Sequence, residues 1–206
     1  MDAAHKTPAR TRNPRGKGEL LRAELVTAAS RLLEDLPGQE ALSLRAVARE
    51  AGVSAPSVYL HFADKSELML AVLERRFAEF GAELEAASSG IDGARDQLRA
   101  RCHAYAEFAG RNPGHYAVMF TAVPETGVSD EADLPGAEIL GGIAGLVAAC
   151  GPSAESPHGP RETALLLWAG LHGIVALRVS KPKIDWPPVG HVVDSLLDRL
   201  VPPAAE

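Results

Sequence analysis

The chain has 206 residues, enough for one domain of ordinary size or two small ones with a buried core. Its composition, 46% hydrophobic and 23% charged, excludes a largely disordered protein. The formal net charge of −6 divides unevenly, because residues 1–65 carry +2, residues 66–206 carry −8 and the first 17 residues alone carry +4. This asymmetry favours an N-terminal part that faces a polyanion and a body with another task.

Residues 1–16 mix Lys, Arg, Pro, Thr and Gly without periodicity, which predicts a flexible basic arm. No hydrophobic segment follows them, so we expect no secretory signal. Apolar residues then recur at spacings of four and three from Leu21 to Leu36, as on one face of a helix. Pro37-Gly38 is expected to end that helix.

Two short helices are predicted next. Ser43 is a suitable N-cap for a helix through Glu50, and Ser54 for a second helix that reaches about His61. Gly52 suits the three-residue turn between them, because glycine adopts left-handed backbone without steric cost. Two short helices joined by such a turn have the shape of a helix-turn-helix.

Asp64 and Glu67 form a capping box that opens a long helix, in which large apolar residues recur from Met69 to Leu84. Beyond it the pattern stays helical, with glycine and proline between the segments. Further helices are predicted at about 92–110, through Met119 and Phe120, at 138–149, at 161–180 and over Val189 to Leu200. Strand alternation and internal repeats are absent from the sequence, so we predict an all-α protein of about nine helices.

Several other classes of protein are excluded. The longest nearly apolar stretch, Ala164 to Leu177, carries His172 and falls short of the roughly 20 residues of a membrane span. The two cysteines, Cys102 and Cys150, are too few for a disulfide framework and fit no metal spacing. Phosphate-binding glycine loops and nucleophile elbows are missing too. We therefore expect a cytoplasmic protein that is not an enzyme and holds no metal or cofactor.

One run of residues is specific in its order and spacing. It consists of Val47-Ala48, Ala51-Gly52-Val53-Ser54, Tyr59-Leu60-His61-Phe62, Lys65 and Leu68. This run resembles the DNA-binding signature of TetR/AcrR-type repressors. The resemblance implies a homodimer of nine- or ten-helix subunits, each with a flexible arm (1–16), a three-helix helix-turn-helix head (17–65) and a helical body (66–206). The head would bind a palindromic operator, and the body would hold a ligand pocket and the dimer interface.

A second, narrower resemblance lies in Trp168, His172 and Gly173, which look like the Trp-His-Gly (WHG) signature of one C-terminal subtype of this family. That signature identifies a branch of the family and no particular ligand.

The first resemblance also implies which side chains contact DNA. They are Arg12, Arg15, Ser43, Arg45, Ala55, Pro56, Ser57, Tyr59, His61 and Lys65. Arg45 is able to read a guanine with two hydrogen bonds, whereas Tyr59 and His61 would hold phosphates or have a purely structural role. The second short helix lacks Arg, Asn and Gln, so we expect indirect readout to contribute to specificity.

Aromatic and other apolar residues of the body are candidates for lining an effector cavity, although such residues at helical spacing are more often simple core. The candidates are Phe77, Phe80, His103, Tyr105, Phe108, Met119, Phe120, Trp168 and His172. His103 and His172 are the polar groups expected to orient a ligand. The alternative for a buried histidine of this kind is a hydrogen bond to a backbone carbonyl.

The helix at 161–180 is apolar on two sides. One stripe holds Trp168, His172, Val175 and Val179, and the other holds Leu167, Leu171 and Ile174. Because both sides must be buried, one would meet the body and the other a partner subunit. We expect a C2 dimer through an intermolecular four-helix bundle. The residues placed near its axis are Leu171, Ile174, Arg178, Val193, Leu196 and Leu200.

These features predict a sequence-specific DNA-binding regulator, interpreted as a repressor that a small apolar or aromatic effector releases from a palindromic operator. Two alternatives stay open: a DNA-binding dimer with a filled core and no effector, and a helical protein–protein adaptor that has lost operator binding. The sequence identifies neither the effector, the operator, the regulated genes nor the sign of regulation.

Overall fold

A computed structural model describes residues 17–35, 42–121, 130–151 and 158–203 of the chain. Within these ranges the regular structure consists of nine α-helices and one short 3₁₀ helix. They are α1 (Lys17–Asp35), α2 (Leu44–Glu50), α3 (Ala55–Tyr59), α4 (Lys65–Ser88), α5 (Ala94–Arg111), α6 (Pro113–Thr121), η2 (Glu131–Asp133), α7 (Ala137–Ala149), α8 (Pro160–Ser180) and α9 (Val189–Leu200). The prediction of an all-α protein of about nine helices is confirmed.

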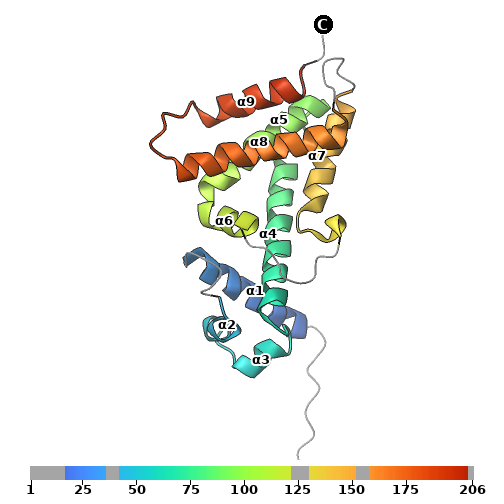
Figure 1. Cartoon of the computed structure of the whole chain (residues 1–206). Helices are drawn as coiled ribbons and strands as arrows, with labels where there is room; N and C mark the ends of the chain where they lie inside the picture. The colour runs from blue at the N-terminus through green and yellow to red at the C-terminus, as the bar shows by residue number, and fades with distance from the viewer. Residues whose placement is uncertain (1–16, 36–41, 122–129, 152–157, 204–206) are drawn as a thin grey trace, which may run out of the picture.

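The helices form two groups that α4 connects (Figure 1). At one end α1, α2 and α3 lie around the first turns of α4, and at the other end α5 and α6 contact α4 while α7, α8 and α9 pack on α5. The first group is called the head below, and the second is called the body.

Hydrogen bonds at the helix starts confirm two of the three expected N-caps. The hydroxyl of Ser43 accepts from the backbone N–H of Ala46 at 3.1 Å, and the Asp64 carboxylate accepts from that of Glu67 at 2.9 Å. Ser54 precedes α3 as expected, but its hydroxyl bonds that of Ser57 at 2.7 Å and caps no backbone group. That part of the prediction is wrong because a nearer hydroxyl takes the hydrogen bond.

Two separate hydrophobic cores hold the groups together. In the head, the fully buried Leu25, Val47 and Phe62 pack against residues 68–73 of α4. In the body, the core is built around residues such as Phe80 and Leu167. Because the head's core includes the first turns of α4, the division expected at residue 65 lies at the edge of this core rather than between the two cores.

Phe77, in the middle of α4, is the side chain that packs against both cores. The next two residues toward the N-terminus of α4 hydrogen-bond to other helices. Arg75 donates a hydrogen bond to the hydroxyl of Thr27 on α1 at 2.7 Å, and Arg76 lies 3.1 Å from Nε2 of His115 on α6. The middle of α4 is therefore in contact with the head on one side and with α6 on the other.

Helix α8 is long and apolar enough to cross a membrane by length and composition alone. The shorter apolar stretch from Ala164 to Leu177 lies inside this helix of 21 residues. Its residues Ala164, Leu167, Leu171 and Val175 are instead buried in the body's core, where they pack beside α7 and α9. Burial of this face is what a core helix of a folded domain requires.

Charged side chains fasten α9 to α5. The guanidinium of Arg99 donates two hydrogen bonds to the Asp194 carboxylate, at 2.7 and 2.8 Å. His103 Nε2 lies 2.7 Å from the same carboxylate, and Arg95 pairs with Asp198 one turn further along α9. The hydrogen bonds from Arg99 and His103 hold the pKa of Asp194 well below its usual value.

Replacement of Asp194 with Asn is therefore expected to make stability less dependent on pH. The pKa of Asp194 is depressed in the folded state. The ionised carboxylate therefore adds to the free energy of unfolding above the pKa of an unfolded Asp, about 4, and this addition is lost as the pH falls below that value. Urea unfolding should show a lower midpoint for Asp194→Asn at neutral pH, with a difference from the unaltered chain that shrinks toward about pH 3.

The matched control is Asp185→Asn, in the exposed segment between α8 and α9. It should leave the unfolding midpoint unchanged at both pH values. If the urea midpoints of Asp194→Asn and the unaltered chain differ by the same amount at neutral pH and at about pH 3, Asp194 is not stabilising in its ionised form.

Candidate functional site

The described residues expected to contact DNA belong to α2, α3, the residues beside these two helices and the start of α4, and α2 and α3 lie at the end of the head away from the body (Figure 1). Ser43, Arg45 and Pro56 are exposed, and Tyr59 has 55% of its surface open to solvent. Ala55, Ser57, His61 and Lys65 are half-buried. Arg12 and Arg15 lie outside the described residues. The exposed residues of this part of the head thus carry hydroxyl, guanidinium and phenol groups, the kinds of group that contact phosphates and base edges.

Two of these residues also have partners within the head. The hydroxyl of Ser57 is bonded to Ser54, and the ring of His61 lies against Gly18, where a Cβ atom would be 3.8 Å from its Cε1. The ring of His61 thus lies close to the first turn of α1, and both roles considered for it stay predictions.

Leu60 is a surface residue that the sequence analysis did not single out. It follows α3 directly and is 70% exposed, more than any other large hydrophobic residue among those described. Its exposure could have been predicted from the sequence. Val58 and Phe62 are four residues apart and both buried, so Leu60, halfway between them, points away from the core of the head. Its side chain extends the tip beside Tyr59.

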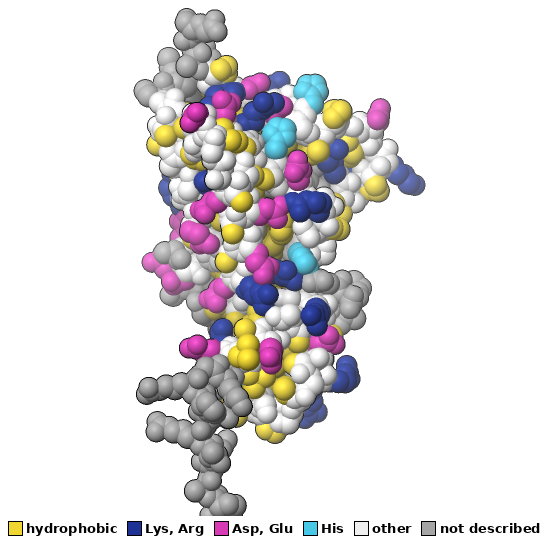
Figure 2. Space-filling model, turned by 180° about the vertical axis from the view of Figure 1, so that it is seen from behind, with side chains coloured by type: hydrophobic (Ala, Val, Ile, Leu, Met, Phe, Trp, Pro, Cys, Tyr) yellow, Lys and Arg dark blue, Asp and Glu magenta, His cyan; other side chains and the backbone are white. Residues whose placement is uncertain are grey.

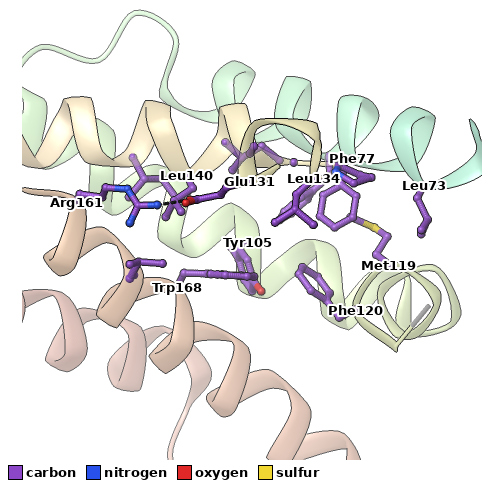
Figure 3. Close-up of a pocket in the computed structure, with 17 residues that line it drawn as sticks. Leu73, Phe77, Tyr105, Met119, Phe120, Glu131, Leu134, Leu140, Arg161 and Trp168 are labelled. Atoms are coloured by element: carbon purple, nitrogen blue, oxygen red, sulfur yellow. Dashed lines mark hydrogen bonds and ion pairs between the residues drawn. The ribbon is translucent and has the colours of Figure 1, made fainter. Parts of the chain in front are cut away.

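A cavity of about 510 Å³ lies in the body between α4, α5, α6, α7 and α8 (Figure 3). It is lined by Leu73, Phe77, Phe80, Tyr105, Met119, Phe120, Glu131, Leu134, Pro135, Gly136, Ala137, Ile139, Leu140, Ile143, Arg161, Leu165 and Trp168. Six of the nine expected residues are in this lining. The segment 134–137 and the α7 residues were missed, because nothing in the sequence brings this part of the chain next to Phe77.

Three of the expected cavity residues lie elsewhere. His103 is turned to the opposite side of α5, where Asp194 binds it, so its assignment to the cavity is wrong. Phe108 is buried behind Phe80, with the two ring centres 4.7 Å apart. His172 lies behind the lining, where its Nδ1 is 2.6 Å from the hydroxyl of Tyr116. For these three residues, helical periodicity did not reveal which neighbour the side chain would meet.

Hydrogen bonds connect the cavity wall to His172. The hydroxyl of Tyr105 lies 2.9 Å from that of Tyr116, and the hydroxyl of Tyr116 lies 2.6 Å from Nδ1 of His172. Burial lowers the pKa of His172 and raises that of Tyr116 to about 12, which keeps both groups neutral.

The segment before α7 closes one side of the cavity against α4. Gly136 has φ +89°, a left-handed conformation, and a Cβ atom there would lie 2.4 Å from Cδ1 of Phe77. Glycine is thus required both for the backbone and for the close approach. The cavity wall is consequently in direct contact with Phe77, which among the described residues is the side chain that packs against both cores.

A groove on the surface leads into this cavity. It is lined by Asp130, Glu131, Ala137, Glu138, Leu140, Gly141, Ala144 and Arg161, four of which also line the cavity. Glu131 and Arg161 form an ion pair at the opening and are both more than half exposed (Figure 3). Figure 2 shows further acidic side chains along one edge of the body.

The interface expected on α8 and α9 needs correction. Leu171 and Val193 are 1% and 0% exposed within a single subunit, so they belong to the body's own core and offer no surface to a partner. The stripes on α8 are likewise assigned wrongly, since Leu167 and Leu171 face the core. The outward face carries Leu166, Gly173 and Leu177, the last of which is 48% exposed.

The remaining four expected interface residues are half-buried and stay predictions. Leu196 packs closely on Gly170, where a Cβ atom would lie 2.6 Å from its Cδ2. Arg178 covers the ring of Trp186, with 5.5 Å between guanidinium carbon and ring centre, and donates to the carbonyl of Pro187. Ile174 and Leu200 also lie at the edge of the α8–α9 pair.

Comparison with known families gives two matches. Residues 25–72 match the model described as bacterial regulatory proteins of the tetR family, and residues 98–201 match a tetracyclin repressor-like C-terminal domain. The second description does not name the Trp-His-Gly subtype, so that narrower expectation stays a prediction.

Individual relatives agree with these matches. The chain is 34% identical over 99 residues to the HTH-type transcriptional activator FasR of Mycolicibacterium smegmatis, which is 48% of this chain and 45% of that protein. The match thus spans less than half of that relative. A structure of a protein of unknown function from Rhodococcus sp. RHA1 is 30% identical, with a TM-score of 0.71 over 87% of this chain and 93% of that one.

The regulator FadR from Bacillus subtilis, solved in complex with stearoyl-CoA, has a TM-score of 0.69 at 15% identity over 87% of this chain and 97% of that one. At that identity the likeness concerns the fold alone. The two family matches, by contrast, cover the helix-turn-helix and the body, including more than half of the chain. The chain belongs to the TetR family of transcriptional regulators, which bind DNA and are not enzymes.

Proposed function

We propose that the protein is a homodimeric repressor that binds a palindromic operator through its two heads and leaves it when a small apolar or aromatic effector occupies the body cavity. The observation that supports this most directly is the contact between that cavity and α4, the helix whose first turns form part of the head. The cavity favours this function over a DNA-binding dimer with a filled core. We expect the protein to act in the cytoplasm.

The chain divides by function into an arm of residues 1–16, a head that extends through about residue 73, and the remaining body. In the head, α3 enters the major groove, with Pro56 and Tyr59 toward the DNA and Arg45 beside them on α2. Lys65 starts α4 at the edge of the same surface. In the dimer the two heads read half-sites about 34–36 Å apart, or a multiple of one helical turn.

Effector and operator are coupled through α4. A ligand in the cavity displaces Phe77 or the segment at Gly136, and either movement shifts the helix relative to Thr27 of α1. A ligand that binds more tightly when the head position is changed than when it suits the operator lowers the affinity for the operator. The factor is the ratio of the ligand's affinities for the two states.

The dimer forms through the outward faces of α8 and α9. Leu166, Gly173 and Leu177 lie on one exposed face of α8, and small residues there allow a second helix to approach closely. Leu196 and Leu200 lie beside this face on α9. Two such pairs of helices related by a twofold axis make a four-helix bundle.

Arg45→Ala is expected to weaken binding to the best sequence selected from random DNA by about 5- to 150-fold, the effect of losing a bidentate base contact. Specificity at one base pair should relax with it. Tyr59→Phe should weaken binding to all sequences alike, because a phosphate contact carries no sequence information. Gel-shift titrations at fixed salt measure both effects.

The control for the DNA experiment is Lys183→Ala, an equal loss of positive charge in the exposed segment before α9. It should leave DNA binding unchanged. If selection from random DNA enriches no sequence at all, the chain is not an operator-binding regulator and the adaptor alternative gains support.

Leu177→Glu is expected to convert the dimer into a monomer, because it places a carboxylate in an apolar contact of the bundle. Sedimentation at micromolar concentration measures the change, and operator affinity should fall with it. Ile184→Glu provides the control, since Ile184 is similarly exposed but lies after α8. A Leu177→Glu protein that sediments as a dimer would place the interface on another surface.

N-phenyl-1-naphthylamine, a neutral aromatic dye whose emission rises in apolar surroundings, is expected to bind the cavity and to release the protein from its selected DNA. Ile143→Trp fills part of the cavity and should abolish both effects while DNA binding persists, at a cost in stability of about 1–3 kcal/mol. Dye binding that survives this substitution would show that the effector site lies elsewhere.

A further inference from the structure

An arginine on α1 lies beside the end of α3, although the two are far apart in the sequence. The guanidinium carbon of Arg22 is 4.9 Å from the centre of the Phe62 ring. Phe62 is fully buried in the core of the head, and its backbone N–H donates to the carbonyl of Val58 in α3 at 3.0 Å. Arg22 therefore covers the ring at the point where the chain leaves the C-terminal end of α3.

One face of α1 runs along this part of the head. Gly18 and Arg22 are one helical turn apart and so lie on the same side of α1. A Cβ atom at Gly18 would be 3.8 Å from Cε1 of His61, and Arg22 lies over the next residue, Phe62. Lys65 follows at the start of α4. Arg22 is thus on the flank that also holds His61 and Lys65, for which phosphate contacts are expected.

The guanidinium of Arg22 is exposed and keeps its hydrogen-bond donors for an external acceptor. Among the residues that the structure describes, none forms an ion pair or hydrogen bond with it, including Glu19 and Glu24 on the same helix. The carboxylates of Asp64 and Glu67 accept from backbone N–H groups at the start of α4. A cation over a ring is held by the ring's face, and the planar guanidinium has five N–H groups to donate.

We infer that Arg22 is a further DNA contact of the head and binds a backbone phosphate beside the half-site, with the Phe62 ring as its support. This inference rests on the proposed function, because it extends the same DNA surface to α1. With α3 in the major groove, a side chain beside its C-terminal end meets the strand that borders the groove rather than a base edge. Guanidinium and phosphate fit each other through two parallel hydrogen bonds.

Substitutions at Arg22 separate this contact from the structural role of covering Phe62. Arg22→Met keeps a long side chain that packs on the ring and removes the charge, and Arg22→Gln removes the charge with a polar side chain. Arg22→Lys keeps the charge. The matched control is Arg31→Ala, because Arg31 is also exposed on α1 and has no ion pair with a described residue. It lies on the opposite face of the helix, about 13 Å further along the axis.

The measurement is the salt dependence of binding to two duplexes, the sequence selected from random DNA and a scrambled sequence of the same composition. Arg22→Met and Arg22→Gln should lower the slope of log affinity against log salt concentration by about one for each head. In a dimer, their loss of affinity should be about tenfold larger at about 50 mM than at about 200 mM salt. Both duplexes should be affected by the same factor, whereas Arg45→Ala changes their ratio. Arg22→Lys and Arg31→Ala should keep the slope.

Neutral methylphosphonates, placed one at a time along the selected duplex, locate the phosphate. The unaltered chain should lose affinity when the phosphate bound by Arg22 is neutralised, at one position beside each half-site. Arg22→Met should be insensitive at that position and respond to the other substitutions as the unaltered chain does, because the two changes remove the same interaction. Far-ultraviolet circular dichroism and thermal unfolding establish that the variants are folded.

Unaltered affinity and slope in Arg22→Met and Arg22→Gln overturn the inference, since Arg22 then only covers Phe62. An equal change of slope in Arg31→Ala overturns it too, because net charge rather than position would account for the effect. In both cases the unaltered chain still binds its selected DNA, and the proposed function stands. If the unaltered chain binds neither duplex, the proposed function fails together with the inference.

Discussion

The unbroken course of α4 through both cores is the constraint on which the rest of the molecule depends. Its 24 residues form one helix from Lys65 to Ser88, with residues 68–73 in the core of the head and Phe80 and Leu84 in that of the body. A continuous helix transmits displacement because bending it would break hydrogen bonds along its axis. Neither group of helices can therefore move relative to the other without moving α4, and Phe77 lies at the point where the two groups meet.

The walls of the cavity are ordered by different means on its two sides. On one side, the hydrogen bonds from Tyr105 to Tyr116 and from Tyr116 to His172 connect α5, α6 and α8. On the other side, the segment around Gly136 lies in close contact with Phe77.

The charge of the chain changes sign close to the division between the two cores, since residues 1–65 carry +2. Residues 66–206 carry a charge of −8, and acidic groups lie along the body and around the groove. Such charges repel the DNA backbone.

The sequence by itself determined the helices, the helix-turn-helix and the family, because these depend on local signals: the Ser43 and Asp64 caps, Gly52 in the turn, and the order of residues from Val47 to Leu68. It also indicated six residues of the cavity, since large apolar side chains on α4, α5, α6 and α8 have to face the interior. Only the tertiary structure decided which side of each helix meets which neighbour. His103 turned to Asp194, Leu171 and Val193 entered the core, and Glu131 met Arg161 across 30 residues of chain. Periodicity gives the angle between side chains on one helix, but the direction of the whole helix is set by packing against partners distant in sequence.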